Sequence, residues 1–170
     1  MIDLPIYLNF TFAFLATIGF AVYFSAPRVS LIPSGIIGGL GWLLYIFLFK
    51  WNDNAVVSTF FAAGFVAFLG EILARRLKNP ATVFTIPGIL PLAPGVGIYN
   101  TMLYMVQKEF ELGFSKGIDT FSIAAAIALG ILVVTSIVNT YNILSKRRLY
   151  KKLEALHGPF HMNLNNRKDS

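Results

Sequence analysis

Three prolines and three glycines lie close together in one uncharged run of the chain, and their types and spacing fit a binding site. The run covers residues 79–107 and is long enough to cross a bilayer, since about 20 apolar residues suffice. Its special residues are Pro87, Gly88, Pro91, Pro94, Gly95 and Gly97. An internal proline removes a backbone donor and clashes with the carbonyl four residues before it. The pattern therefore predicts a helix that is broken between residues 87 and 97.

A helix that is broken inside a membrane exposes backbone groups that can bind a ligand. Irregular backbone persists in hydrocarbon only when it is buried in protein or lines a wet cavity. Pro94 and Gly95 precede a stretch that can be helical, which predicts a half-helix starting near residues 95–97. The positive end of its dipole would favour a carboxylate. The predicted substrate-binding residues are Pro87, Gly88, Pro91, Pro94, Gly95, Gly97, Tyr99 and Asn100. The alternative is a kinked helix that binds nothing.

Glu71 is the second candidate, because it is an acidic residue near the end of an apolar run. A carboxylate inside a membrane is a functional candidate by default, so Glu71 could carry a coupling ion. Arg75 follows four residues later, and the two side chains could instead form an ion pair at the end of a helix. The sequence leaves both interpretations open.

Other chemistry has little support in this sequence. No zinc-protease or serine-hydrolase motif occurs, and no phosphate-binding loop with a lysine is present. The chain has no cysteine. His157 and His161 are four residues apart, but Gly158 and Pro159 interrupt the helix that would align them, so no metal site is predicted. We therefore expect a protein that is not an enzyme and uses no cofactor.

The composition and the spacing of charges indicate the elements that must position these residues. The chain has 170 residues, of which 56% are hydrophobic and 13% are charged. Charges are separated by five apolar runs of spanning length, which predicts an all-α integral membrane protein with about five transmembrane helices. The predicted spans are 5–24, 34–49, 55–73, the broken segment within 79–107, and 120–143. Pro27 and Pro33 are expected to end any helix between the first two spans, and residues 107–119 are expected to form a polar loop.

Small residues recur at helical spacing in three spans. Gly35 and Gly39 form one such pair, and two longer series follow. The series are Ala63, Ala67, Gly70 and Ala74 in the third span, and Ser122, Ala126 and Gly130 in the fifth. Small residues let helices approach closely in lipid, so these faces are predicted to pack against other helices. The polar residues Asn9, Thr11 and Thr17 of the first span are expected to bond back to backbone carbonyls.

The end of the chain differs in charge from the rest. Residues 146–170 carry seven of the fourteen Lys and Arg residues and only two acids. We predict a transmembrane module at 1–145 and a basic cytoplasmic tail at 146–170 that contacts anionic lipid headgroups. No nucleic-acid-binding module accompanies the basic residues, so nucleic acid is not an expected partner.

The distribution of basic residues predicts an orientation. With five crossings and the N-terminus outside, eleven Lys and Arg residues fall on the inner side and three on the outer side. Basic residues accumulate on the cytoplasmic side of membrane proteins. The prediction is a multi-pass protein of the inner membrane with its N-terminus outside and its C-terminus in the cytoplasm.

The broken segment resembles the characteristic stretch of the threonine/serine exporter family. The matching residues are Val83, Phe84, Pro87, Gly88, Ile89, Pro91, Leu92, Pro94, Gly95 and Tyr99. The chain is most similar to the short single-module proteins that correspond to the C-terminal half of the long exporters. The resemblance in size and hydropathy covers about residues 5–145, and the motif itself covers about twenty residues.

The resemblance implies transport of small metabolites by a two-component exporter. Threonine and serine are substrates in the family, and a related branch exports a dicarboxylate such as succinate. A larger membrane subunit is implied as a partner, because the N-terminal half of the long exporters is missing, and copies of this chain could complete the pathway as well. The alternative function is a non-transporting membrane scaffold or assembly subunit.

Overall fold

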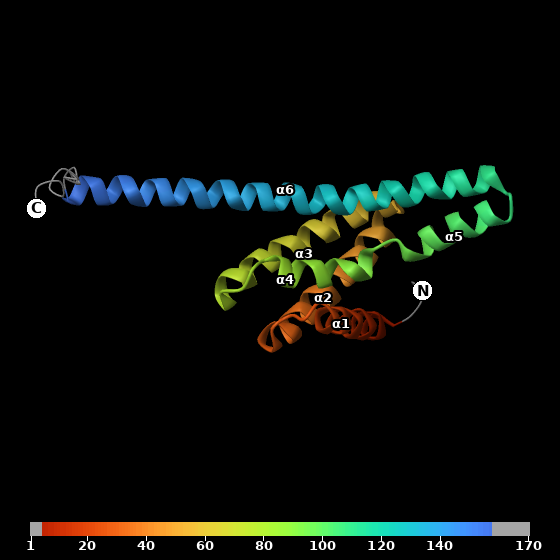
Figure 1. The fold of residues 1–170 in the computed structure, drawn as a ribbon, viewed down its shortest axis with the longest axis horizontal. Helices are drawn as coiled ribbons and strands as arrows, with labels where there is room; N and C mark the ends of the chain where they lie inside the picture. Colours follow the sequence, from red (N-terminus) through yellow and green to blue (C-terminus); the bar gives the residue numbers. More distant parts are fainter. Residues whose placement is uncertain (1–4, 158–170) are drawn as a thin grey trace, which may run out of the picture. The chain divides into compact units, whose positions relative to one another are not determined.

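The computed structural model describes residues 5–157, with side chains through residue 144 except residue 142. The described chain is helical and has no strand, which confirms the predicted all-α fold (Figure 1). The elements are α1 (Ile6–Tyr23), α2 (Arg28–Asn52), α3 (Ala55–Leu77), α4 (Thr82–Ile89), the 3₁₀ helix η1 (Leu90–Leu92), α5 (Gly95–Val106) and α6 (Phe110–His157). Four of the described helices are long and apolar enough to cross a membrane, and the bent pair around η1 makes a fifth candidate.

Helices α1 and α2 pack closely because the contact face of α2 is made of glycines. A Cβ added to Gly35 would lie 2.8 Å from Ile18 Cγ1, and one added to Gly39 would lie 2.5 Å from Phe10 Cε2. Between them, Gly38 lies directly against the side chain of Thr17. The predicted role of Gly35 and Gly39 in close helix packing is therefore confirmed.

The small residues of α3 form the centre of the core. Ala63 and Ala67 are fully buried, and Ala74 is 8% exposed. Gly70 faces Thr85 of α4, because a Cβ on Gly70 would lie 2.5 Å from Thr85 Oγ1. Helix α4 thus packs against both α2 and α3 (Figure 1). The buried ring of Phe84 joins this core.

Helices α5 and α6 form a hairpin through a second set of small residues. The glycines in α6 face α5, since a Cβ on Gly113 would lie 3.2 Å from Met105 Cγ and one on Gly117 would lie 3.3 Å from Thr101 Cγ2. Farther along α6, a Cβ on Gly130 would lie 2.5 Å from the carbonyl oxygen of Phe60 in α3. The predicted contact face of the fifth span is confirmed at Gly130 and at Ala126, which is 4% exposed.

Two predicted helix boundaries are wrong. Pro33 does not end a helix but lies inside α2, which begins directly after Pro27. Pro33 deprives only the Val29 carbonyl of a donor. The first turn is held by Ser30, whose amide donates to the Pro27 carbonyl at 2.8 Å and whose Oγ accepts from Asn79 Nδ2 at 2.9 Å.

The predicted polar loop at 107–119 is also wrong for most of its length. Helix α6 begins at Phe110, so that only a three-residue turn separates it from α5. The amide of Glu109 donates to the Tyr104 carbonyl at 2.9 Å, and the amide of Gly113 donates to the Glu109 carbonyl at 2.9 Å. Packing of the α6 glycines on α5 supports a helix that local polarity alone disfavours.

Most polar groups in the spans are satisfied within their own helix. Thr11 donates to the Tyr7 carbonyl at 2.7 Å, and Thr17 donates to the Ala13 carbonyl at 2.8 Å, as predicted. Asn9 is different, because its Oδ1 accepts from Trp42 Nε1 of α2 at 3.4 Å. This side chain therefore links two helices instead of bonding only to its own.

The chain divides into two compact units, residues 1–135 and 136–170. Helix α6 continues across the predicted boundary at residue 145, and the division into a module and a tail stays a prediction. The side chains of residues 145–157 and all of residues 158–170 lie outside the described part of the structure. The lipid contact of the basic tail and the course of the chain after Gly158 therefore remain predictions from sequence.

Candidate functional site

The predicted break in the fourth span is present and is built by its prolines. Helix α4 ends at Ile89, η1 contains Pro91, and Pro94 precedes the first residue of α5. Residue 93 is extended, with ψ of 135°. The two helical parts of the segment are bent by 51° from one another. The new helix begins at Gly95, as the sequence predicts.

Pro87 lies inside α4 without ending it, and a hydroxyl of α2 lies near the carbonyl that it leaves free. The missing amide of Pro87 would have bonded to the Val83 carbonyl four residues before it. Ser34 Oγ of α2 lies 3.4 Å from that carbonyl oxygen, while its shorter hydrogen bond, at 2.7 Å, goes to the Ser30 carbonyl. In addition, the amide of Leu90 donates to the Pro87 carbonyl. A buried hydroxyl of another helix is thus shared between the Ser30 carbonyl and the backbone that proline weakens.

Gly88 serves the packing of α4 in the core. A Cβ on Gly88 would lie 2.9 Å from Val66 Cγ1 and 3.4 Å from Ile37 Cγ2. It would also lie 3.9 Å from the amide nitrogen of Gly38, which is about 15 Å along α2 from its start. Gly88 therefore lies against the middle part of α2. Gly88 is buried, so its role is close helix approach.

The start of α5 has free backbone donors and open space. The amides of Gly95 and Ile98 donate to the carbonyls of residues 93 and 94, at 2.8 and 3.0 Å. The amides of Val96 and Gly97 have no acceptor in the described part of the chain, and no side chain caps this helix. A Cβ on Gly95 would meet nothing within 4 Å.

The remaining predicted residues differ in their surroundings. Gly97 lies against α6, where a Cβ would be 2.5 Å from Thr120 Oγ1. Tyr99 is 63% exposed, and Asn100 is half-buried. The structure therefore separates Pro87 and Gly88, which are buried, from Gly95, Gly97, Tyr99 and Asn100 after the break. Pro91 and Pro94 are half-buried and form the break itself.

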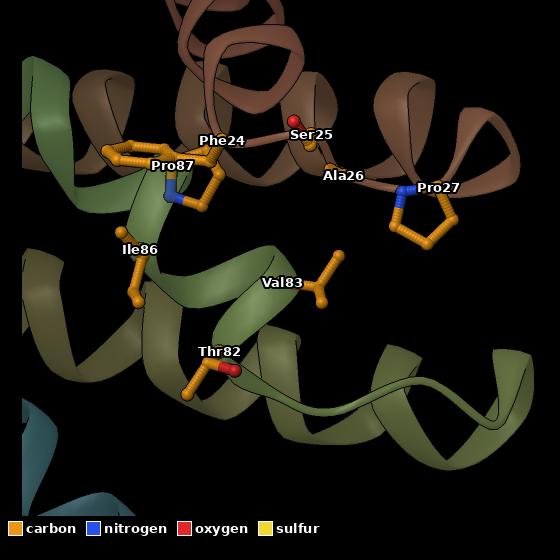
Figure 2. A pocket seen from close by; sticks show the side chains of 8 residues that line it. All are labelled: Phe24, Ser25, Ala26, Pro27, Thr82, Val83, Ile86 and Pro87. Carbon is orange, nitrogen blue, oxygen red and sulfur yellow. The ribbon is translucent and has the colours of Figure 1, made fainter.

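A pocket of about 310 Å³ lies on the other side of the break. It is lined by residues of the α1–α2 connection and of α4 (Figure 2): Phe24, Ser25, Ala26, Pro27, Thr82, Val83, Ile86 and Pro87. Among the predicted site residues, only Pro87 takes part. Sequence reasoning missed this pocket because its two walls are more than fifty residues apart in the chain. Pro27 marks a turn, but no local signal pairs that turn with α4.

Glu71 is half-buried on α3, and Arg75 is exposed. Among the described side chains, the ion pair is Lys116–Asp119, at 3.6 Å, and no ion pair joins Glu71 to Arg75. The interpretation of Glu71 as half of an ion pair thus has no support in this structure. No group of residues that could hold a metal ion occurs in the part of the chain that was described.

The fold and the broken span define the class: a multi-pass membrane protein with an interrupted helix, an arrangement that transporters use to build substrate sites. Residues 9–137 match the family described as "Threonine/Serine exporter, ThrE". The chain therefore belongs to the threonine/serine exporter family, which confirms the resemblance seen at the proline motif. This is a family of transporters and not of enzymes, in agreement with the sequence prediction.

Three relatives show how the chain compares in length. It is 34% identical over 128 residues to an uncharacterised protein of Haemophilus influenzae, covering 71% of this chain and 43% of the relative. It is 32% identical to a threonine/serine exporter of Corynebacterium glutamicum, over 67% of this chain and 23% of the relative. It is 28% identical to a probable threonine/serine exporter of Mycobacterium tuberculosis, over 76% of this chain and 25% of the relative. The chain thus spans less than half the length of these relatives. No solved structure matches it.

Proposed function

We propose that this chain is a subunit of a secondary exporter that moves small carboxylate-bearing metabolites across the inner membrane. Threonine and serine are the first candidates, since they are named for two of the relatives, and a dicarboxylate such as succinate is the next. The observation that carries the proposal is the half-helix at Gly95. Its amides at Val96 and Gly97 have no acceptor in the described structure and follow the break in the fourth span.

The proposed substrate contact is a carboxylate at the start of α5. The positive end of a helix dipole and free amides favour an anion. Gly95 has no side chain to obstruct its approach, and Tyr99 and Asn100 lie within the first turns of the same helix. Pro91 and Pro94 hold the break, and Pro87 and Gly88 anchor α4 in the core.

The subunit needs a partner to complete a transport path. Helix α5 has no buried residue in this single chain, and large apolar side chains such as Val96, Met102 and Val106 are at least 66% exposed. The named exporters are about four times as long as the matched segment. We propose that a larger membrane subunit, copies of this chain, or both cover this surface.

We propose the orientation that the basic residues favour, with the N-terminus outside and the C-terminus in the cytoplasm. Reporter fusions within residues 108–117 and after residue 145 test it, because five crossings place these two sites on opposite sides. The same signal from both fusions would contradict five crossings.

Flux measurements test the function directly. Vesicles containing the full chain, with and without the candidate partner, are loaded with labelled threonine, serine or succinate. We expect release of at least one of them to depend on this chain. Gly95→Val should abolish that release with normal protein level, because the new side chain blocks the start of α5, where an added Cβ meets no neighbour within 4 Å. Absence of release from an intact assembly would favour the scaffold alternative.

Glu71 is the proposed ion-coupling residue. If Glu71 carries a proton during transport, Glu71→Gln should abolish transport driven by a pH gradient while leaving the protein level unchanged. Arg75→Gln is the matched control, because no ion pair joins Arg75 to Glu71 in the described structure. Unchanged transport by Glu71→Gln across the pH range would remove Glu71 from the mechanism.

A further inference from the structure

Hydrogen bonds hold the segments that carry the two walls of the pocket between the α1–α2 connection and α4. Asn79, which precedes α4, donates through Nδ2 to Ser30 Oγ of α2 at 2.9 Å. Ser34 Oγ of α2 lies 3.4 Å from the Val83 carbonyl oxygen, although its shorter bond goes to the Ser30 carbonyl, and both serines are fully buried. On the opposite wall, the amide of Ala26 donates to the Ala21 carbonyl at 2.9 Å. A pocket held on both sides is formed before a ligand arrives, which lowers the cost of binding.

Two hydroxyl groups in this pocket are available to a ligand. Eight other Ser and Thr hydroxyls in the described structure donate to the carbonyl four residues before them. Ser25 and Thr82 make no side-chain hydrogen bond within the described residues, and they come from different walls of the pocket (Figure 2). Ser25 is at a φ of 56°, a conformation that is uncommon for residues other than glycine.

The rest of the lining limits the chemistry of the ligand. Phe24, Pro27 and Ile86 contribute apolar surface, and no lining residue is charged. A volume of about 310 Å³ is near the lower end of the range for small-molecule pockets, which starts at about 300 Å³. The pocket therefore fits a small group that has both a hydroxyl and an apolar edge.

We propose that this pocket binds the side chain of a β-hydroxy amino acid, with the hydroxyls of Ser25 and Thr82 as hydrogen-bonding partners. The proposal rests on the exporter function above and adds a second substrate contact. The pocket lies before the break in the fourth span, whereas the start of α5 lies after it. The substrate would therefore occupy the two contacts one after the other. The pocket would hold its side chain, and the start of α5 would hold its carboxylate.

Alkylation of a single cysteine tests occupancy of the pocket without requiring transport. The chain has no cysteine, so Ile86→Cys provides a unique thiol at a lining position that is 45% exposed. Membrane vesicles containing the full chain are treated with a permeant maleimide in the presence of L-threonine or L-valine. Valine has the shape of threonine without the hydroxyl.

We expect L-threonine at about ten times its dissociation constant to slow alkylation roughly tenfold. L-valine should need an about three- to tenfold higher concentration for the same protection, because it lacks one hydrogen-bonding group. When Ser25→Ala and Thr82→Val are added to the reporter chain, L-threonine and L-valine should protect the thiol at equal concentrations. Val29→Cys is the control, because Val29 is close to Pro27 but does not line the pocket, and neither amino acid should change its rate.

The outcomes separate this proposal from the exporter function. No protection by threonine, or equal protection by valine in the reporter chain, would overturn the pocket assignment even if export is normal. Protection that depends on Ser25 and Thr82 in a protein without export would support the pocket and contradict the exporter function.

Discussion

Helices α1 to α4 and the α5–α6 hairpin both pack through small residues, but they differ in the share of their residues that is buried. In the spanning stretches of α2 and α3, 39% of residues are buried, compared with 11% in that of α6. Gly38 and Gly88 are enclosed by side chains of other helices, whereas Gly95 faces open space. The first region has a buried core of its own, although the spanning stretch of α1 is only 22% buried. The second presents apolar surface that only lipid or another chain can cover.

The largest effect of the tighter packing in helices α1 to α4 is expected at Gly38. In Gly38→Ala, the new Cβ would overlap the side chain of Thr17, which is fully buried and β-branched. We expect a loss of about 1–3 kcal/mol in the free energy of unfolding, because overpacking a tight core is destabilising. Unfolding in detergent measures it.

Gly19→Ala is the matched control in the same helix pair. A Cβ on Gly19 meets nothing within 4 Å, and alanine favours a helix over glycine by up to about 1 kcal/mol. This variant should be as stable as the original or more stable. Equal losses for Gly19→Ala and Gly38→Ala would show that α1 and α2 are not closely packed.

A smaller effect is expected where a hydrogen bond holds the core region to α4. Asn79→Ala removes the donor to Ser30 Oγ and leaves that fully buried hydroxyl without this partner. We expect a loss of about 1–2 kcal/mol, measured by the same unfolding experiment. Asn139→Ala is the control, because Asn139 is exposed on α6. The free energy of unfolding of this variant should equal that of the original protein. A silent Asn79→Ala would mean that the α3–α4 connection is held by packing alone.

The smallest effect is expected in the hairpin. In Gly97→Ala, the new Cβ displaces the Thr120 side chain, which donates to the Lys116 carbonyl at 2.6 Å. The gain in helix propensity partly offsets the cost of displacing Thr120. We therefore expect the free energy of unfolding to fall by less than about 1 kcal/mol. Gly95→Ala should be neutral. A loss at Gly97 as large as that at Gly38 would show that the hairpin is packed as tightly as the core.

This contrast also changes how the two glycine positions serve as probes of the site. The sequence treats Gly95 and Gly97 alike, because both lack a side chain near the proposed carboxylate. The structure places Gly97 against Thr120, so that a valine there would disturb α5 and α6 whether or not a substrate binds. Gly95→Val is the variant that reports on the site alone.

Features that depend on the local chain were predictable from the sequence. Proline lacks an amide wherever it stands, so Pro91 and Pro94 interrupt the fourth span and α5 begins at Gly95. The spacing of charges is equally local, and it gave the correct number of candidate spans. The predictions failed at Pro33 and at the start of α6, where contacts from other helices stabilise a backbone that its own residues disfavour.

The sequence by itself determined the membrane class, the family and the position of the break, because apolar length and proline chemistry act within a short stretch of chain. Only the tertiary structure decided what each special residue does. Pro87 lies inside α4 with Ser34 Oγ of α2 near the carbonyl that it leaves free, and Gly88 is a packing residue since Val66 lies against it. Ser25 and Thr82 line the same pocket because α4 packs against α1. Such pairings join residues that are far apart in sequence, and no local pattern encodes them.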